Sequence, residues 1–166
     1  MKSAGYVGTA LALGLSLAAT TACADAAVAV SLWDKGPDSV VTDDATMAIM
    51  GKMDPTNMSK GTMGLTLDQT SVAAGNVTFN VTNDSKDIIH ELIVSPVAAG
   101  LTELAFLKDE MRVDEDTAGH LGEVSELDPG KTGTVTIALT AGTYILYCNI
   151  PAHFDDGMWT LLTVTP

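Results

Sequence analysis

Short apolar segments recur along this chain, and the clearest of them alternate apolar with polar residues. In NVTFNVTND, at positions 76–84, Val77, Phe79 and Val81 alternate with polar side chains. Alternation with a period of two predicts a strand with one buried face. Further segments with strand patterns lie at 27–33, 63–69, 88–94, 132–139, 142–148 and 158–164. Turn residues separate several of them and no regular helical segment alternates with them, so we expect an all-β fold, an antiparallel β-sandwich.

One segment has a different pattern. LTELAFLKDEM, at positions 101–111, predicts a short helix within a long connection. The chain shows no internal repeat. We divide it into a leader at 1–24, a first strand with a methionine-rich segment at 27–64, and a core at 65–166.

The N-terminus has the organisation of an export signal. Lys2 precedes the apolar stretch 7–19, which is too short to span a bilayer, and the small residues of TTACADAA follow. We expect cleavage between positions 22 and 26 and a periplasmic or otherwise exported mature protein. Cys23 leaves a lipid-anchored N-terminus open as an alternative, although Thr20 stands where such signals usually have Leu.

The charge of the chain limits the classes of partner that it can bind. The formal net charge is −13, with only 8 Lys and Arg residues. Such a surface repels nucleic acid and anionic membranes, and it favours a positively charged protein partner. We therefore expect no nucleic-acid binding and no membrane insertion. We also expect a monomer.

The cysteine count directs attention to one loop. Of the two cysteines, Cys23 lies in the expected cleavage region, so the mature domain keeps Cys148 alone. A lone cysteine in an oxidising compartment cannot form an internal disulfide, so Cys148 is either an inert buried thiol or a chemically used one. It begins the segment CNIPAHFDDGM, which also contains His153 and Met158. These neighbours favour the second interpretation.

A second histidine comes from another strand. His90 lies in IIHELIV, at positions 88–94, where the period of two places it on one face with three aliphatic side chains. Such a histidine is either a core residue with satisfied hydrogen bonds or a ligand. The same period places Cys148 on one face of its strand with Tyr144 and Leu146.

Together these side chains form a donor set for copper that changes between two oxidation states. Sulfur suits Cu(I), imidazole suits both states, and a trigonal His2Cys plane with a long axial Met bond is the blue-copper geometry. We predict that His90, Cys148, His153 and Met158 bind one type 1 copper ion. For Met158 the alternative is that it is simply the first core residue of the last strand.

At these residues the sequence resembles the cupredoxins, the small blue-copper proteins. The resemblance covers roughly 65–164 and rests on His90 and the segment YxxYCNIPxHFxxGM, with ligand spacing Cys-x4-His-x4-Met close to that of rusticyanin-like loops. It implies a Greek-key β-sandwich, one type 1 copper and one-electron shuttling between redox proteins. With the acidic surface, a basic partner such as a c-type cytochrome is expected. Glu91 departs from the family, where a small polar residue often follows the first histidine, and this leaves the hydrogen bonding around the site open.

Related sites need donors that the chain lacks. The binuclear centre of cytochrome oxidase requires a second Cys where Ala152 stands, and catalytic copper requires further histidines, of which only His120 is left. A Cys-His protease is also unsuitable, because Cys148 follows three apolar residues of a strand. We expect an exported electron carrier and not an enzyme. The alternative is a periplasmic copper-binding protein for copper delivery or storage.

The methionine-rich segment bears on that alternative. Its methionines are Met47, Met50, Met53, Met58 and Met63. They either gather Cu(I) or form an adaptable apolar flap over the sandwich, and we favour the flap. We expect His120 to be a solvent-facing loop residue.

Overall fold

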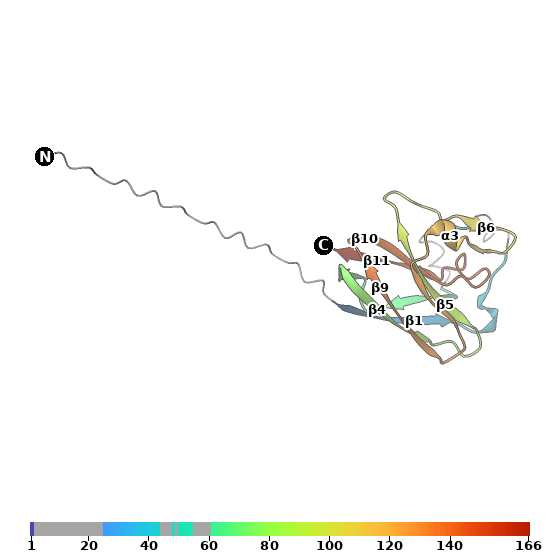
Figure 1. Ribbon diagram of the computed structural model, residues 1–166. Coiled ribbons are helices and arrows are strands. Elements are labelled where there is room, and N and C mark those ends of the chain that lie inside the picture. Colours follow the sequence, from blue (N-terminus) through green and yellow to red (C-terminus); the bar gives the residue numbers. More distant parts are fainter. Residues whose placement is uncertain (2–24, 44–47, 49, 55–60) are drawn as a thin grey trace.

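The computed structural model describes residues 1, 25–43, 48, 50–54 and 61–166, and it contains two sheets packed face to face with a small ribbon beside them (Figure 1). In spatial order the first sheet contains β2 (Met63–Leu67), β1 (Ala26–Asp34), β4 (Gly75–Asn83) and β9 (Thr132–Leu139). The second contains β3 (Ser71–Ala73), β11 (Trp159–Thr165), β10 (Gly142–Tyr147), β5 (His90–Val97) and β8 (Gly122–Leu127). The remaining elements are β6 (Phe106–Leu107), β7 (Arg112–Val113), the 3-10 turn η1 (Pro37–Ser39) and the one-turn helix α3 (Glu115–Ala118).

The all-β sandwich that the sequence predicts is confirmed, with one correction to its strand directions. Most neighbouring strands are antiparallel, but β1 pairs with β4 in parallel, and β11 pairs with β3 in parallel. The chain passes from β2 in the first sheet to β3 in the second and back to β4 in the first. Strands joined by such crossings need not alternate in direction, so the sheets are mixed rather than antiparallel.

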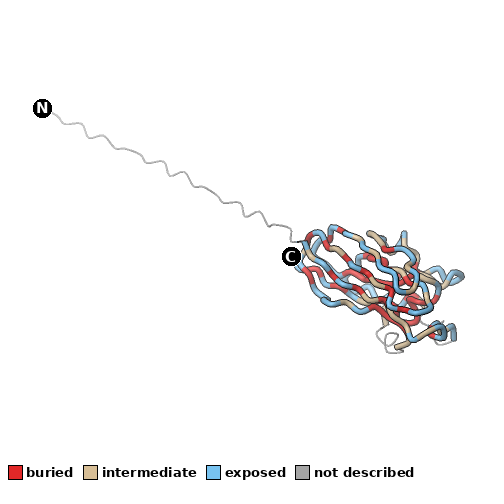
Figure 2. The backbone as a smooth tube through the Cα atoms, turned by 90° about the horizontal axis from the view of Figure 1, so that it is seen from below, coloured by how far each residue is buried: buried red, intermediate tan, exposed pale blue. Residues whose placement is uncertain are grey.

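The core between the sheets follows the alternation seen in the sequence. Along β4 every second residue is buried, and Val77, Phe79 and Val81 all face the other sheet. The strands β1, β9 and β11 show a similar alternation, and Figure 2 shows buried and exposed residues alternating along much of the backbone. Burying one such side chain contributes about 1.5–3 kcal/mol, so this pattern fixes which face of each strand turns inwards.

The second sheet is covered on both faces, which explains the unbroken apolar run in β10. Tyr144 and Leu146 lie in the core between the sheets. Ile145 and Tyr147 instead belong to an outer cluster, a separate buried group on the other face of this sheet that consists of Ile93, Leu104, Val113, Ile145, Tyr147, Phe154 and Trp159. Through the outer cluster, the connection between β5 and β8 packs against the second sheet, which holds the predicted ligands.

The helix expected at 101–111 is wrong. This segment contains an isolated bridge between Lys52 and Glu103, the strand β6 and a turn at Met111, whose φ is 53°. Leu104 is buried in the outer cluster, and Phe106 packs against it two positions later. A burial period of two, together with hydrogen bonds to the segment around Gly51, outweighs the helical propensity of these residues. Strand β8 was not expected either, because only Val124 of its six residues is buried.

Several sequence predictions fall where the structure describes nothing. The leader at 2–24, including Cys23, lies outside the described residues, as do Met47 and Met58. Met53 packs against the outer cluster and Met63 lies in the core between the sheets. No helix within the described ranges is long and apolar enough to cross a membrane.

Candidate metal centre

The four predicted ligands lie at one end of the second sheet. His90 is the first residue of β5, Cys148 follows β10 directly, and Met158 directly precedes β11. His153 lies in the turn between Cys148 and Met158. Because β10 pairs with both β5 and β11, the ends of these strands bring the four residues together. All four are buried, with exposed fractions of 0% for His90, Cys148 and Met158 and 2% for His153.

Three of the four present their donor atoms to a common point. The His90 Nδ1 atom is 3.2 Å from His153 Nδ1, and Cys148 Sγ is 3.4 Å from His153 Nδ1 and 3.9 Å from His90 Nδ1. The centre of a triangle with these sides is about 2.0 Å from each corner, which is close to the usual length of a metal bond to nitrogen or sulfur. Within the described chain, the donor triangle formed by these three atoms therefore fits one trigonally bound metal ion.

Burial keeps these donors uncharged while no metal is bound. It raises the pKa of the Cys148 thiol to about 12, with hydrogen bonds from the Glu91 and Ile150 amides acting in the opposite direction. It lowers the pKa of His90 against the effect of Asp34, and it lowers that of His153 to about 3 with help from His90. Both imidazoles are thus neutral, as metal ligation requires, and only the thiol must lose a proton.

The loop from Cys148 to Met158 is held closed by its own backbone. The Cys148 amide donates to the Met158 carbonyl at 3.0 Å, and the Met158 amide donates to the His153 carbonyl at 3.0 Å. Gly157 adopts a φ of 94°, which an L side chain rarely tolerates, so the return into β11 requires glycine there. These bonds fix the spacing between the donors. Met158 also packs in the core between the sheets, so its role as a fourth ligand stays a prediction.

Buried polar side chains attach this loop to the rest of the protein. The Asn149 side chain accepts from the Val113 amide at 2.7 Å and donates to the Val113 carbonyl at 3.0 Å and to Glu115 Oε1 at 2.8 Å. Asp155 Oδ1 accepts from the Gly51 amide at 2.9 Å, and Asp156 Oδ2 accepts from the Val41 amide at 2.7 Å. No role was predicted for these three residues from the sequence, although all of them lie in the segment that contains Cys148, His153 and Met158.

Glu91, the departure from the family pattern, joins the two sides of the site. Its amide donates to Cys148 Sγ at 3.5 Å, and its carboxylate accepts from the Asn149 amide at 3.1 Å. Burial raises the pKa of Glu91 to about 7, and the charges of Glu115, Glu123 and Glu126 contribute to the rise. The thiol therefore receives a backbone hydrogen bond here whatever the side chain of residue 91.

Asp34, the last residue of β1, also contacts the site and was not predicted from the sequence. Its Oδ2 atom is 2.9 Å from His90 Nε2, and both side chains are buried, with exposed fractions of 1% and 0%. A carboxylate on the second nitrogen of a ligand histidine is a known way to orient the ring. No signal in the sequence indicates this contact, because the two residues are 56 positions apart.

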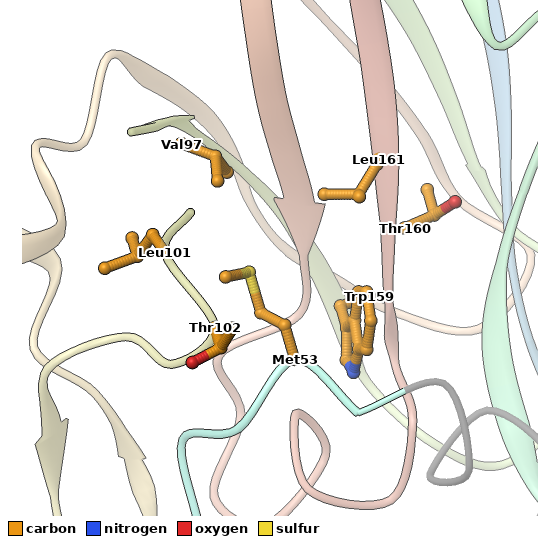
Figure 3. Close-up of a pocket in the computed structure, with 7 residues that line it drawn as sticks. All are labelled: Met53, Val97, Leu101, Thr102, Trp159, Thr160 and Leu161. Atoms are coloured by element: carbon orange, nitrogen blue, oxygen red, sulfur yellow. The ribbon is translucent and has the colours of Figure 1, made fainter. Parts of the chain in front are cut away.

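Two other features lie away from the donor triangle. His120 is exposed, as expected, and its Nε2 atom is 3.7 Å from Glu123 Oε2, with Glu115 nearby. An apolar groove on the outer side of the second sheet is lined by Met53, Val97, Leu101, Thr102, Trp159, Thr160 and Leu161 (Figure 3). None of the four predicted ligands lines the groove, so it is separate from the candidate metal centre.

Comparisons with known proteins agree with this geometry. No family model matches the chain. Auracyanin-B from Chloroflexus aurantiacus (strain ATCC 29366 / DSM 635 / J-10-fl) is 42% identical over 52 residues, which is 31% of this chain but only 22% of the length of that protein. A solved structure of auracyanin B has a TM-score of 0.50 and 20% identity, with 89% of this chain and 93% of that chain covered. Rusticyanin from Thiobacillus ferrooxidans has a TM-score of 0.52 and 15% identity, with coverages of 85% and 77%.

The two structural likenesses concern the fold, and the sequence match concerns a limited segment. The chemistry comes from the chain itself, in which a buried thiol and two neutral imidazoles meet at one end of a β-sandwich. These findings together show a cupredoxin-like β-sandwich fold, with a candidate metal centre at one end and a 52-residue segment similar in sequence to auracyanin-B.

Proposed function

We propose that this protein is an exported carrier of single electrons in which His90, Cys148 and His153 hold one type 1 copper ion and Met158 is its axial ligand. The observation that carries the proposal is the donor triangle, whose sides of 3.2, 3.4 and 3.9 Å fit one metal ion without rearrangement. Bound copper supplies a one-electron redox couple. The protein supplies a fixed donor set around it.

The rigidity of the site suits electron transfer. His90 is placed by the sheet, and the loop is closed by the hydrogen bonds between Cys148, His153 and Met158. Anchors such as Asn149 then restrain the loop from outside. Donors held in this way move little when the charge of a bound ion changes by one unit. The reorganisation energy of electron transfer is therefore small.

The second candidate function is copper delivery or storage through the methionine-rich segment. Two methionines of the segment favour the carrier, because Met63 and Met53 pack in two different apolar clusters and are not gathered at one site. A carrier keeps its copper through many cycles, whereas a delivery protein gives it up. Dialysis of the copper-loaded protein against a chelator, followed by voltammetry, separates the two: retained copper with a reversible one-electron wave supports the carrier, and rapid loss supports delivery.

The partner that we propose is a basic redox protein such as a c-type cytochrome. Glu115, Glu123 and Glu126 lie close enough to Glu91 to raise its pKa, so acidic groups gather beside the strand that carries His90. Such a face attracts a positive partner most strongly at low salt. We expect the bimolecular electron-transfer rate with a basic cytochrome to fall as ionic strength rises. A rate that stays flat or rises with salt would show that the acidic surface serves solubility alone.

Export is the remaining part of the proposal, and it rests on the leader sequence. Mass spectrometry of the protein recovered from its native compartment tests it directly. A new N-terminus between positions 22 and 26 supports export with cleavage, and an added lipid mass on Cys23 supports an anchored form. An intact leader on protein from the cytoplasm would contradict both.

A further inference from the structure

Asp34 is a buried acid beside the candidate metal centre that is not one of the predicted ligands. Its carboxylate lies at the end of β1, in the first sheet, whereas His90 begins β5 in the second. The two side chains meet at 2.9 Å between Asp34 Oδ2 and His90 Nε2, and neither is exposed by more than 1%. Burying a carboxylate costs free energy unless it is hydrogen-bonded, so a buried carboxylate at this position indicates a function.

The carboxylate is positioned by its own surroundings. The backbone of Asp34 pairs with Met63 in β2, and the next amide, of Lys35, donates to the Thr62 carbonyl at 2.9 Å. The second carboxylate oxygen, Oδ1, accepts from the Gly36 amide at 2.6 Å. Asp34 therefore presents Oδ2 to His90 while Oδ1 is held by the Gly36 amide.

Ser85 adds a further restraint. Its hydroxyl oxygen accepts from the Asp87 amide at 3.2 Å and from the Ile88 amide at 2.9 Å, and its side chain hydrogen bonds to Asp34. Since the hydroxyl oxygen already accepts twice, its proton is the part left for the carboxylate. The Asp34 carboxylate thus accepts hydrogen bonds from the Gly36 amide and from Ser85, so it also acts as an acceptor towards His90.

A carboxylate that already receives hydrogen bonds from its surroundings acts as an acceptor, and this decides where the proton of the facing ring lies. For His90 to donate to Asp34, its proton must lie on Nε2, the nitrogen that is 2.9 Å from Asp34 Oδ2. Nδ1 is then unprotonated and faces the other two donors. The tautomer that binds metal is therefore present before a metal arrives.

The other histidine lacks this arrangement. The contacts of the His153 ring are with His90 Nδ1 and Cys148 Sγ, and in the described part of the chain no carboxylate hydrogen bonds to it. A carboxylate that is hydrogen-bonded to one imidazole makes that ring a stronger electron donor to the metal. A stronger donor favours the more highly charged copper ion.

We infer that Asp34 is a positioning residue that fixes the metal-binding tautomer of His90 and biases the bound copper towards its oxidised state. This inference rests on the proposed copper site, which it deepens. Asp34 touches the ligand and not the metal, so removing its charge changes the balance between the two copper states more than it changes the ligand set.

The first experiment compares Asp34→Asn with Asp87→Asn. Asp87 is an exposed acid at the same end of the sandwich, so its variant makes the same change of charge without touching His90. Copper-loaded proteins are equilibrated with a one-electron mediator of known potential, and reduced copper is read from the loss of absorbance. We expect Asp34→Asn to shift the equilibrium about tenfold towards Cu(I), which corresponds to about 59 mV, and Asp87→Asn to shift it less than about twofold.

The second experiment needs no copper and no variant. Nitrogen-15 NMR of the metal-free wild-type protein reports which ring nitrogen of His90 carries the proton. We expect the proton on Nε2. A proton on Nδ1 overturns the inference even if Asp34→Asn does not fold, and so does an Asp34→Asn shift no larger than that of Asp87→Asn. If the wild-type protein binds no coloured copper, the proposed function fails instead, and the NMR result still decides the tautomer.

Discussion

The two halves of the candidate metal centre are held in different ways. His90 stands on β5, and its ring is oriented by Asp34 from the opposite sheet. Cys148, His153 and Met158 belong to a loop whose shape depends on turn hydrogen bonds and on anchors such as Asn149. The strand half is set by the core of the sandwich, so it forms when the protein folds. The loop half depends on a few polar contacts, and these are the places where the site can be loosened selectively.

The largest expected effect concerns the protons that the two halves of the site release when a metal binds. The pKa of His90 is lowered by burial, and that of His153 is about 3, so neither releases a proton near neutral pH. The thiol of Cys148, with its pKa raised to about 12, is protonated throughout this range and must release one. Affinity for a metal of fixed valence such as Zn²⁺ should therefore rise roughly tenfold per pH unit from about pH 7 upwards.

Calorimetry in buffers of different ionisation enthalpy counts the released protons. One proton per metal ion, lost in the Cys148→Ser variant, agrees with this assignment. Two protons would mean that a histidine is charged before binding, and the strand half would then not be ready in advance.

Asn149→Ala is expected to loosen the loop half alone. The substitution removes three hydrogen bonds to Val113 and Glu115 and leaves buried backbone groups without partners. We expect the free energy of unfolding to fall by about 2–4 kcal/mol in denaturant titrations, with weaker metal binding. Asn80→Ala, at an exposed position on β4, is the matched control and should cost less than about 0.5 kcal/mol. Equal losses in the two variants would contradict the anchoring role of Asn149.

Substitutions at Met158 test whether one residue of the loop half is a ligand of the copper. Thioethers are weak donors that favour Cu(I), and the axial ligand tunes the potential of a His2Cys site. Met158→Gln provides a harder oxygen donor and should lower the reduction potential, whereas Met158→Leu removes the donor and should raise it. A shift of about 59 mV corresponds to a tenfold change in the balance of the two states, and voltammetry resolves this easily. Shifts of the same sign, or none, would leave Met158 a packing residue.

Much of this architecture could be predicted from local sequence patterns, and the failures have physical causes. The alternation in β4 and the donors His90, Cys148 and His153 are local signals, and the structure confirms the strand and brings the three donors together. The parallel pairing of β1 with β4 depends on the order in which the chain crosses between sheets, which no local pattern records.

The residues around the site were harder to predict for a related reason. Asp34 reaches His90 only because two distant strands lie opposite one another, and an aspartate at a strand end has no distinctive neighbours. The segment 101–111 has helical composition, yet the burial of Leu104 against the second sheet decides its conformation. In each case a contact between distant residues determines a feature that the local sequence leaves open.

The most direct test of the copper site is the visible absorption of the oxidised, copper-loaded protein, compared with that of Cys148→Ser. Charge transfer from a thiolate to Cu(II) requires Cys148, so we predict an intense blue or green colour at one copper per chain. The colour should be absent from the variant, while far-ultraviolet circular dichroism shows that its β-sandwich is intact. A colourless wild-type protein, or a colour that survives in Cys148→Ser, would contradict the proposed centre.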